Sequence, residues 1–100
     1  MDEYVNYLVN KLGDSTTATG IQGYSLDNEP GLWHHTHSLV HSEPATFDEL
    51  VEKSVNLATA VKKVDANAEI FGPALFGYSA FMRLADDEAW KATYGKEYDW

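Results

Sequence analysis

The feature that most constrains the fold is a long apolar stripe in the middle of the chain, over residues 47–64. Its members recur every three or four residues, as on one face of an amphipathic helix: Phe47, Leu50, Val51, Val55, Leu57, Ala58, Val61 and Val64. Thr46 and Glu49 have the spacing of a capping box, in which the hydroxyl and the carboxylate each bind an amide at the helix start. The sequence therefore predicts a helix that opens at residue 47 and buries one face.

The segments on either side of this helix read as strands. Residues 21–26 and 68–71 carry branched and aromatic side chains, and turn-forming residues close them at 27–31 and 72–73. Two strands joined by a helix of this length most simply run parallel through a right-handed crossover. A parallel sheet needs more than two strands and helices over its faces. The pattern predicts an α/β fold that is incomplete on its own.

Three further regions complete the chain. A helix that Asp2 would cap and Gly13 would end is predicted by apolar residues at helical spacing: Val5, Leu8, Val9 and Leu12. Residues 32–44 contain four His and one Trp without a regular period, which predicts a long loop. The tail, residues 80–100, has helical stretches, and its acidic run 86–88 fits a helix start better than a calcium site.

Composition excludes several classes of function. Sixteen acidic residues against seven basic ones give a formal charge of −9, which repels nucleic acid and anionic membrane surfaces. The sequence has no cysteine, which rules out disulfides and thiolate metal sites. No apolar run approaches the roughly 20 residues that span a bilayer, and the first residues lack the pattern of a secretory signal. We expect either a cytoplasmic protein or a segment of a longer secreted one.

The run Asp27-Asn28-Glu29-Pro30 lies where the first strand ends, which is the catalytic face of a parallel α/β barrel. Pro30 disfavours helical dihedrals at Glu29, so we expect Glu29 to be extended at the strand tip. Cleaving a glycosidic bond needs one carboxylic acid to protonate the leaving oxygen and a second carboxylate to attack or to activate water. Glu29 fits the first role, and Asn28 fits a hydrogen bond to the sugar 2-hydroxyl. The alternative is an ordinary surface turn.

Aromatic residues near this run have two interpretations. Trp33 either stacks on a sugar face or anchors the loop, and the sequence does not decide between them. For Tyr24 we favour core packing, whereas Phe76 and Tyr78 follow the second strand and fit a cleft wall. Glu69 is not a substitute for a second catalytic carboxylate, because it begins its strand and so lies at the opposite edge from Glu29.

The four histidines of the loop are His34, His35, His37 and His41. Neutral imidazoles bind zinc, but this spacing matches no helical ligand pattern. We therefore predict no metal ligands here and favour hydrogen bonds to the loop or to a substrate, with His37 placed at the substrate. The role of the cluster as a whole stays open.

Four stretches of the chain closely resemble glycoside hydrolase family 44. They are D-E-Y-V-N-Y-L-V-N-K-L-G (2–13), G-I-Q-G-Y-S-L-D-N-E-P-G-L-W (20–33), H-T-H (35–37) and E-I-F-G-P-A-L-F-G (69–77). The resemblance implies a (β/α)₈ TIM barrel with an added β-sandwich, and cleavage of β-1,4-glucans such as cellulose derivatives or xyloglucan with retention. It implies that Glu29 is the acid/base and Asn28 contacts the sugar. Trp33 and His37 complete the expected substrate-binding set.

The resemblance also implies that residues 1–100 are a fragment of a single TIM-barrel catalytic domain, from about the third helix to the fifth strand. The nucleophilic glutamate of the family ends the seventh strand, beyond Trp100, so we expect the isolated chain to be inactive. We expect an extracellular parent enzyme that acts on β-glucan, without a required cofactor but with room for structural calcium or zinc. The alternatives are a non-catalytic carbohydrate-binding or interaction fragment and a His-dependent metal protein. The preferred glucan and the oligomeric state stay open.

Overall fold

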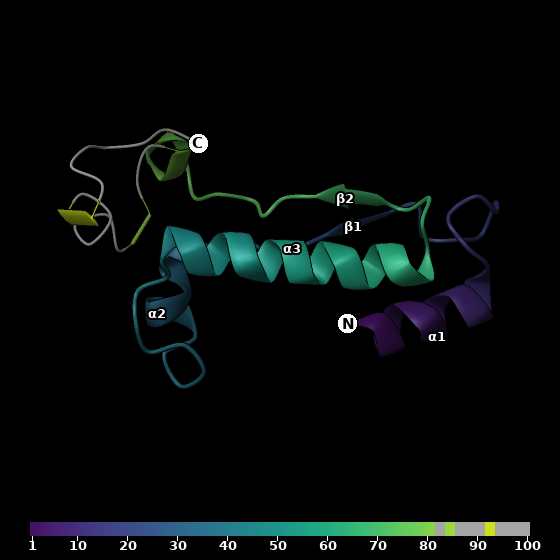
Figure 1. Cartoon of the computed structure of the whole chain (residues 1–100), viewed down its shortest axis with the longest axis horizontal. Helices are drawn as coiled ribbons and strands as arrows, with labels where there is room; N and C mark the ends of the chain where they lie inside the picture. The colour runs from purple at the N-terminus through teal and green to yellow at the C-terminus, as the bar shows by residue number, and fades with distance from the viewer. Residues whose placement is uncertain (82–83, 86–91, 94–100) are drawn as a thin grey trace.

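A computed structural model describes residues 1–81, 84–85 and 92–93 of the chain (Figure 1). The predicted helix–strand–helix–strand order is confirmed, with short helical turns at two connections. In chain order the elements are α1 (Asp2–Leu12), β1 (Gly23–Ser25), η1 (Pro30–Leu32), α2 (Trp33–Thr36), α3 (Phe47–Val64), β2 (Glu69–Phe71) and η2 (Tyr78–Phe81). The predicted acidic helix start at 86–88 lies outside the described residues.

The two strands lie side by side and run parallel, as predicted. Gly23 pairs with Glu69, Tyr24 with Ile70 and Ser25 with Phe71. Helix α3 runs back along them in the opposite direction, so their carboxyl ends point toward the end of the molecule where α2 lies and α3 begins (Figure 1). Both strands are shorter than predicted, because the regular ladder between them covers three residue pairs.

Helix α3 is the longest element and begins as predicted. The Thr46 hydroxyl accepts a hydrogen bond from the Glu49 amide at 3.1 Å, which satisfies one donor of the first turn. The second half of the predicted capping box is wrong. The Glu49 carboxylate lies 2.8 Å from His41 Nε2 and 3.5 Å from Lys53 Nζ, because those two cationic groups attract it away from the helix start.

Helix α1 has the predicted range, but Asp2 does not cap it. Met1 occupies the cap position, and Asp2 falls in the first turn, where its carboxylate accepts from the Glu3 amide at 3.0 Å. Gly13 ends the helix as expected, with φ 92°. A Cβ there would lie 2.5 Å from Thr17 Oγ1, so both the dihedral and the space require glycine.

Among the residues that the structure describes, two small clusters form the core, one toward each end of α3. At its carboxyl end α1 packs on α3, and Val5, Val61 and Ala68 are buried with Tyr24 and Ile70 against them. This confirms core packing for Tyr24. At its amino end the cluster is formed by Ala45, Phe47, Leu50 and Leu84, with Trp33 packed on it.

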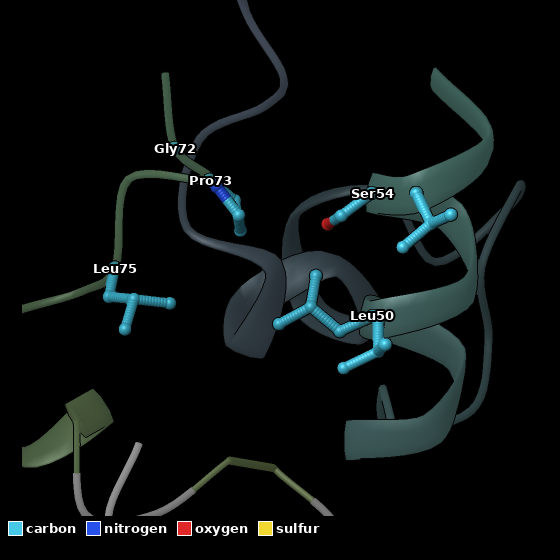
Figure 2. Close-up of a pocket in the computed structure, with 7 residues that line it drawn as sticks. Leu50, Ser54, Gly72, Pro73 and Leu75 are labelled. Atoms are coloured by element: carbon cyan, nitrogen blue, oxygen red, sulfur yellow. The ribbon is translucent and has the colours of Figure 1, made fainter. Parts of the chain in front are cut away.

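The prediction of one continuous buried stripe on α3 is wrong at two positions. Val51 is 48% exposed and Val55 is 58% exposed. These two valines line a cleft of about 330 Å³ together with Leu50 and Ser54 of the same helix and with Gly72, Pro73 and Leu75 (Figure 2). The apolar residues of α3 therefore form two faces, one covered by α1 and the strands and one open in the described part of the chain.

A buried carboxylate ties the two connections at the amino end of the sheet together. Asp65 is 3% exposed and accepts hydrogen bonds from the Ser15 amide at 2.7 Å and the Ser15 hydroxyl at 2.8 Å. Burial raises the pKa of Asp65, but the hydrogen bonds from Ser15 outweigh burial and hold that pKa below its ordinary value. The end of α3 is thereby fixed to the segment that enters β1.

The predicted loop over residues 32–44 begins with helical turns. Pro30 presets the φ of the first position of η1, and the Thr36 hydroxyl donates back to the Leu32 carbonyl at 3.0 Å. The sequence did not predict these turns, because helical segments of three or four residues are too short to show an apolar repeat. No helix in the described part of the chain is long and apolar enough to cross a membrane.

Candidate active site

Glu29 lies at the carboxyl end of the paired strands. The parallel pairing continues past β1: the Leu26 amide donates to the Phe71 carbonyl at 2.9 Å, and Asn28 forms a bridge with Ala74. The Glu29 amide then donates to the Ala74 carbonyl at 2.7 Å. In a parallel α/β sheet this edge is where ligands bind.

The backbone of Glu29 is left-handed, with φ 51° and ψ 54°, so the expected extended conformation is wrong. Pro30 does exclude the right-handed helical region, but the chain must reverse here to start η1. The Leu32 amide binds the Glu29 carbonyl at 2.9 Å and holds the reversal. A residue with a side chain in this region costs about 1–3 kcal/mol, and such strain concentrates at functional sites.

The residues just before Glu29 present polar groups at the same edge. Asn28 is exposed, and its backbone N–H donates to Asp27 Oδ1 at 2.6 Å. The Asp27 carbonyl accepts from the Ala74 amide at 2.9 Å, so the backbone of this run is pinned to the segment after β2. Glu29 itself is half-buried. The run Asp27-Asn28-Glu29 therefore presents a carboxylate and an amide from a fixed backbone.

A second cleft, of about 500 Å³, opens between the loop after Glu29 and helix α3. The loop side contributes Trp33, His37 and His41, and Asp27 lies at the strand end. The structure thus brings two predicted substrate residues, Trp33 and His37, to one wall. The lining does not include Glu29 or Asn28, which are in neither of the clefts described here.

Trp33 is half-buried and touches the core rather than standing free. It packs on the cluster around Phe47 and Leu50, and its ring lies 5.3 Å from the ring of His41 at an interplanar angle of 58°. This contact fits an anchor for the loop, while its place in the cleft lining fits contact with a ligand. Both interpretations of Trp33 remain compatible with the geometry.

His41 and Glu49 form a pair that the sequence did not reveal. His41 Nε2 lies 2.8 Å from Glu49 Oε1, and the hydrogen bond to Glu49 raises the pKa of His41 against the effect of burial. Burial raises the pKa of Glu49, but the hydrogen bond and charge of His41, with Lys53, outweigh it and lower that pKa. Both shifts favour a charged pair. Glu49 fitted the capping pattern so well that no signal pointed to His41.

The other histidines do not form a ligand set. The rings of His34 and His35 lie with their centroids 3.9 Å apart at an interplanar angle of 42°, and His37 Nδ1 lies 2.8 Å from the Thr36 hydroxyl. Across the residues that the structure describes, no group of three or more His, Asp or Glu side chains is arranged to hold a metal ion. The His-dependent metal protein considered from the sequence therefore gains no support.

The remaining candidates divide between the two edges of the sheet. Glu69 starts β2 and pairs with Gly23, so it lies at the edge opposite Glu29, as expected. Phe76 and Tyr78 follow β2 on the Glu29 side and are both exposed. Their predicted role in a cleft wall stays a prediction.

Parallel strands joined by a helix define the class as an α/β protein, with the left-handed Glu29 at the carboxyl edge of the strands. The model of glycoside hydrolase family 44 matches residues 1–100. The chain belongs to glycoside hydrolase family 44.

Relatives and solved structures agree with this assignment. The chain is 53% identical over 100 residues to Endoglucanase A of Paenibacillus lautus and 47% identical to Beta-mannanase/endoglucanase A of Caldicellulosiruptor saccharolyticus. It covers 14% and 7% of these two proteins. A family 44 endoglucanase structure from Clostridium thermocellum matches all of the chain, at 58% identity and TM-score 0.88, over 19% of its own length. A Paenibacillus polymyxa xyloglucanase determined with xyloglucan matches 99% of the chain, at 48% identity, TM-score 0.88 and 19% of its own length.

Proposed function

We propose that this chain supplies the acid/base glutamate, Glu29, of an enzyme that hydrolyses β-1,4-glucosidic bonds in cellulose-type glucans or xyloglucan. One observation carries the proposal: a half-buried glutamate with a left-handed backbone stands at the carboxyl end of two parallel strands. The names of the similar proteins, endoglucanase and xyloglucanase, support the substrate class.

The proposed reaction is a double displacement with retention. Protonated Glu29 gives its proton to the glycosidic oxygen while the bond from that oxygen to the sugar C1 breaks. A carboxylate from outside this chain bonds to C1. The Glu29 carboxylate then takes a proton from water, whose oxygen attacks C1 and releases the second carboxylate. In this proposal Asn28, which is next to Glu29 and exposed, hydrogen-bonds the sugar 2-hydroxyl.

The architecture we propose is part of a (β/α)₈ barrel, from about its third helix to its fifth strand. The parallel pairing and the order of helices and strands support it. In the same proposal the parent enzyme is extracellular and needs no cofactor, and the remaining strands and a β-sandwich complete it. The full-length enzyme has room for structural calcium or zinc. Trp33 and His37 form one wall of the glucan-binding cleft.

A chimera provides the folded context for a test. These 100 residues would replace the matching segment of the Clostridium thermocellum endoglucanase, to which they are 58% identical. Replacing Glu29 by Gln should lower kcat/KM on soluble β-glucan by roughly 10²- to 10⁴-fold, the usual contribution of a general acid/base. The matched control is Glu52→Gln, an exposed carboxylate on α3 that should leave activity unchanged.

The choice of substrate separates an acid from a structural role. An aryl glucoside with a strongly acidic phenol needs no proton on its leaving oxygen, so Glu29→Ala should still form the glycosyl-enzyme and show a burst of phenol. Added azide should then attack the glycosyl-enzyme and release a β-glycosyl azide, because azide, unlike water, needs no general base. Equal losses on glucan and on the activated substrate, without azide rescue, would contradict the acid/base role.

A non-catalytic carbohydrate-binding fragment is the second candidate. The observation in its favour is that Trp33 and His37 line a cleft from which Glu29 is absent. If the chain only binds glucan, Glu29→Gln leaves every function of the chimera intact while Trp33→Ala weakens binding.

A further inference from the structure

The segment that follows Glu29 is held by a chain of contacts that the reaction does not use. Trp33 begins α2 directly after η1, whose first hydrogen bond starts at the Glu29 carbonyl. One short 3₁₀ turn therefore joins Trp33 to the backbone of Glu29.

Trp33 makes two packing contacts. It packs on the core cluster at the start of α3, and its ring lies against the ring of His41, with the ring centroids 5.3 Å apart. His41 is in turn bound to α3, because its Nε2 donates to Glu49 Oε1 at 2.8 Å. Its own amide donates to the His37 carbonyl at 2.8 Å, which closes the turn of the loop.

The protonation of the His41 ring is constrained by this arrangement. Nε2 must carry a hydrogen to bind a carboxylate, in both the neutral and the charged ring. Nδ1 is buried, and the contacts that orient the ring are the hydrogen bond of Nε2 to Glu49 and the ring contact with Trp33. Glu49 is itself fixed by the cap contact of its amide with Thr46 and by Lys53.

We propose that His41 is a positioning residue, which clamps Trp33 against the start of α3 through Glu49 and so orients the glucan-binding wall beside Glu29. The consequence for glucan binding rests on the proposed function, whereas the clamp itself does not.

The clamp should weaken as the pH rises. The hydrogen bond to Glu49 raises the pKa of His41, so the charged pair is fully present below the ordinary histidine pKa and is lost as the pH rises through the raised one. Burial raises the pKa of Glu49, but His41 and Lys53 outweigh burial and lower that pKa. Glu49 therefore stays ionised over the pH range in which His41 loses its proton. Lys53 opposes protonation of His41 and the backbone of Glu43 favours it, while Asp27 and His37 line the same cleft.

The test uses the chimera with His41→Ala and His41→Gln, and with His35→Gln as the matched control, because His35 is exposed and lines neither cleft. His41→Ala should raise KM for soluble glucan about tenfold at acidic pH with little change in kcat, since it removes a hydrogen bond between charged groups. The unsubstituted chimera should show KM rising through the raised pKa of His41. His41→Gln, a neutral donor, should remove that step and give a KM between the other two.

Hydrogen exchange measured by mass spectrometry gives a readout that does not depend on activity. Exchange in residues 33–45 should be faster in His41→Ala and unchanged in residues 2–12. Unchanged exchange in 33–45 would refute the clamp, whatever happens to activity. Faster exchange with the same KM, or a pH step that persists in His41→Gln, would refute the positioning role. If the proposed function is wrong, Glu29→Gln will keep full activity. The hydrogen-exchange result for His41→Ala does not depend on that outcome.

Discussion

At the scale of single residues, Glu29 combines a reactive group with an unfavourable backbone. The carboxylate is what the proposed chemistry needs, while φ 51° is a conformation that glycine adopts more readily than glutamate. The hydrogen bonds to Ala74 and Leu32 hold it there. A residue chosen for stability alone at this position would be glycine, so the glutamate indicates a requirement other than stability.

A pair of substitutions at this position tests that argument. Relief of the left-handed conformation by glycine is worth about 1–2 kcal/mol, and the greater freedom of the unfolded glycine chain costs about 0.5–1 kcal/mol. In the chimera Glu29→Gly should therefore be more stable than Glu29→Ala by about 0.5–1 kcal/mol, while both lose hydrolysis of glucan. Urea unfolding of the two variants measures the difference. Equal stabilities would mean that the backbone relaxes out of the left-handed region.

Asp65 is the clearest single residue for stability. It is buried, and Asp65→Asn removes the charge that Ser15 binds through both its amide and its hydroxyl. We expect a loss of about 1–3 kcal/mol in the chimera, the range for a buried group that loses its hydrogen-bond partners. Glu52→Gln, an exposed carboxylate, is the control and should change stability little.

The same residue has a defined pH signature. The hydrogen bonds from Ser15 outweigh burial and lower the pKa of Asp65, so its stabilisation is present above the ordinary aspartate pKa. It is lost as the pH falls through the lowered value. Thermal unfolding from neutral to acidic pH should show a smaller drop in Tm for Asp65→Asn than for the unsubstituted chimera. If Tm falls equally in both proteins as the pH becomes acidic, the pH dependence belongs to other carboxylates.

At the scale of elements, the sequence predicted the features that depend on local patterns of residues. The ranges of α1 and α3 and the parallel strands follow from apolar spacing, from Gly13 and from Thr46, each of which acts within a few residues. The two faces of α3 were not predictable, because Val51 and Leu50 have the same apolar chemistry and differ in which neighbour covers them.

The candidate site shows the same division. The position of Glu29 at a strand end followed from local pattern, since a strand signal and a turn signal meet there. Its left-handed backbone did not, because Ala74, a residue far along the chain, holds its amide. The pairing of His41 with Glu49 was hidden for a related reason: Glu49 satisfies a local rule through its amide and a distant contact through its carboxylate.

At the scale of the whole molecule, the open face of α3 and the proposed second carboxylate from outside this chain both imply a larger fold around these residues. Among the described residues, Glu69 lies at the wrong edge to act with Glu29, so the isolated chain should not hydrolyse carboxymethylcellulose. The exposed Val51 and Val55 and the unpaired edges of a two-stranded sheet should also make it associate. Turnover by a pure, monomeric preparation would contradict both expectations.

Substitution of the open face should have opposite effects in the two contexts. In the isolated chain, Val51→Lys with Val55→Lys removes exposed apolar surface and should raise solubility, as followed by light scattering and sedimentation. If the proposed barrel covers the cleft of Figure 2, the same lysines in the chimera should lower stability by several kcal/mol, because they bury unpaired charge. Glu52→Lys, one position along the same helix, adds charge where the side chain is exposed and should be mild in both. If the valine substitutions were equally mild in the chimera, α3 would face solvent there, and the proposed barrel would place this helix wrongly.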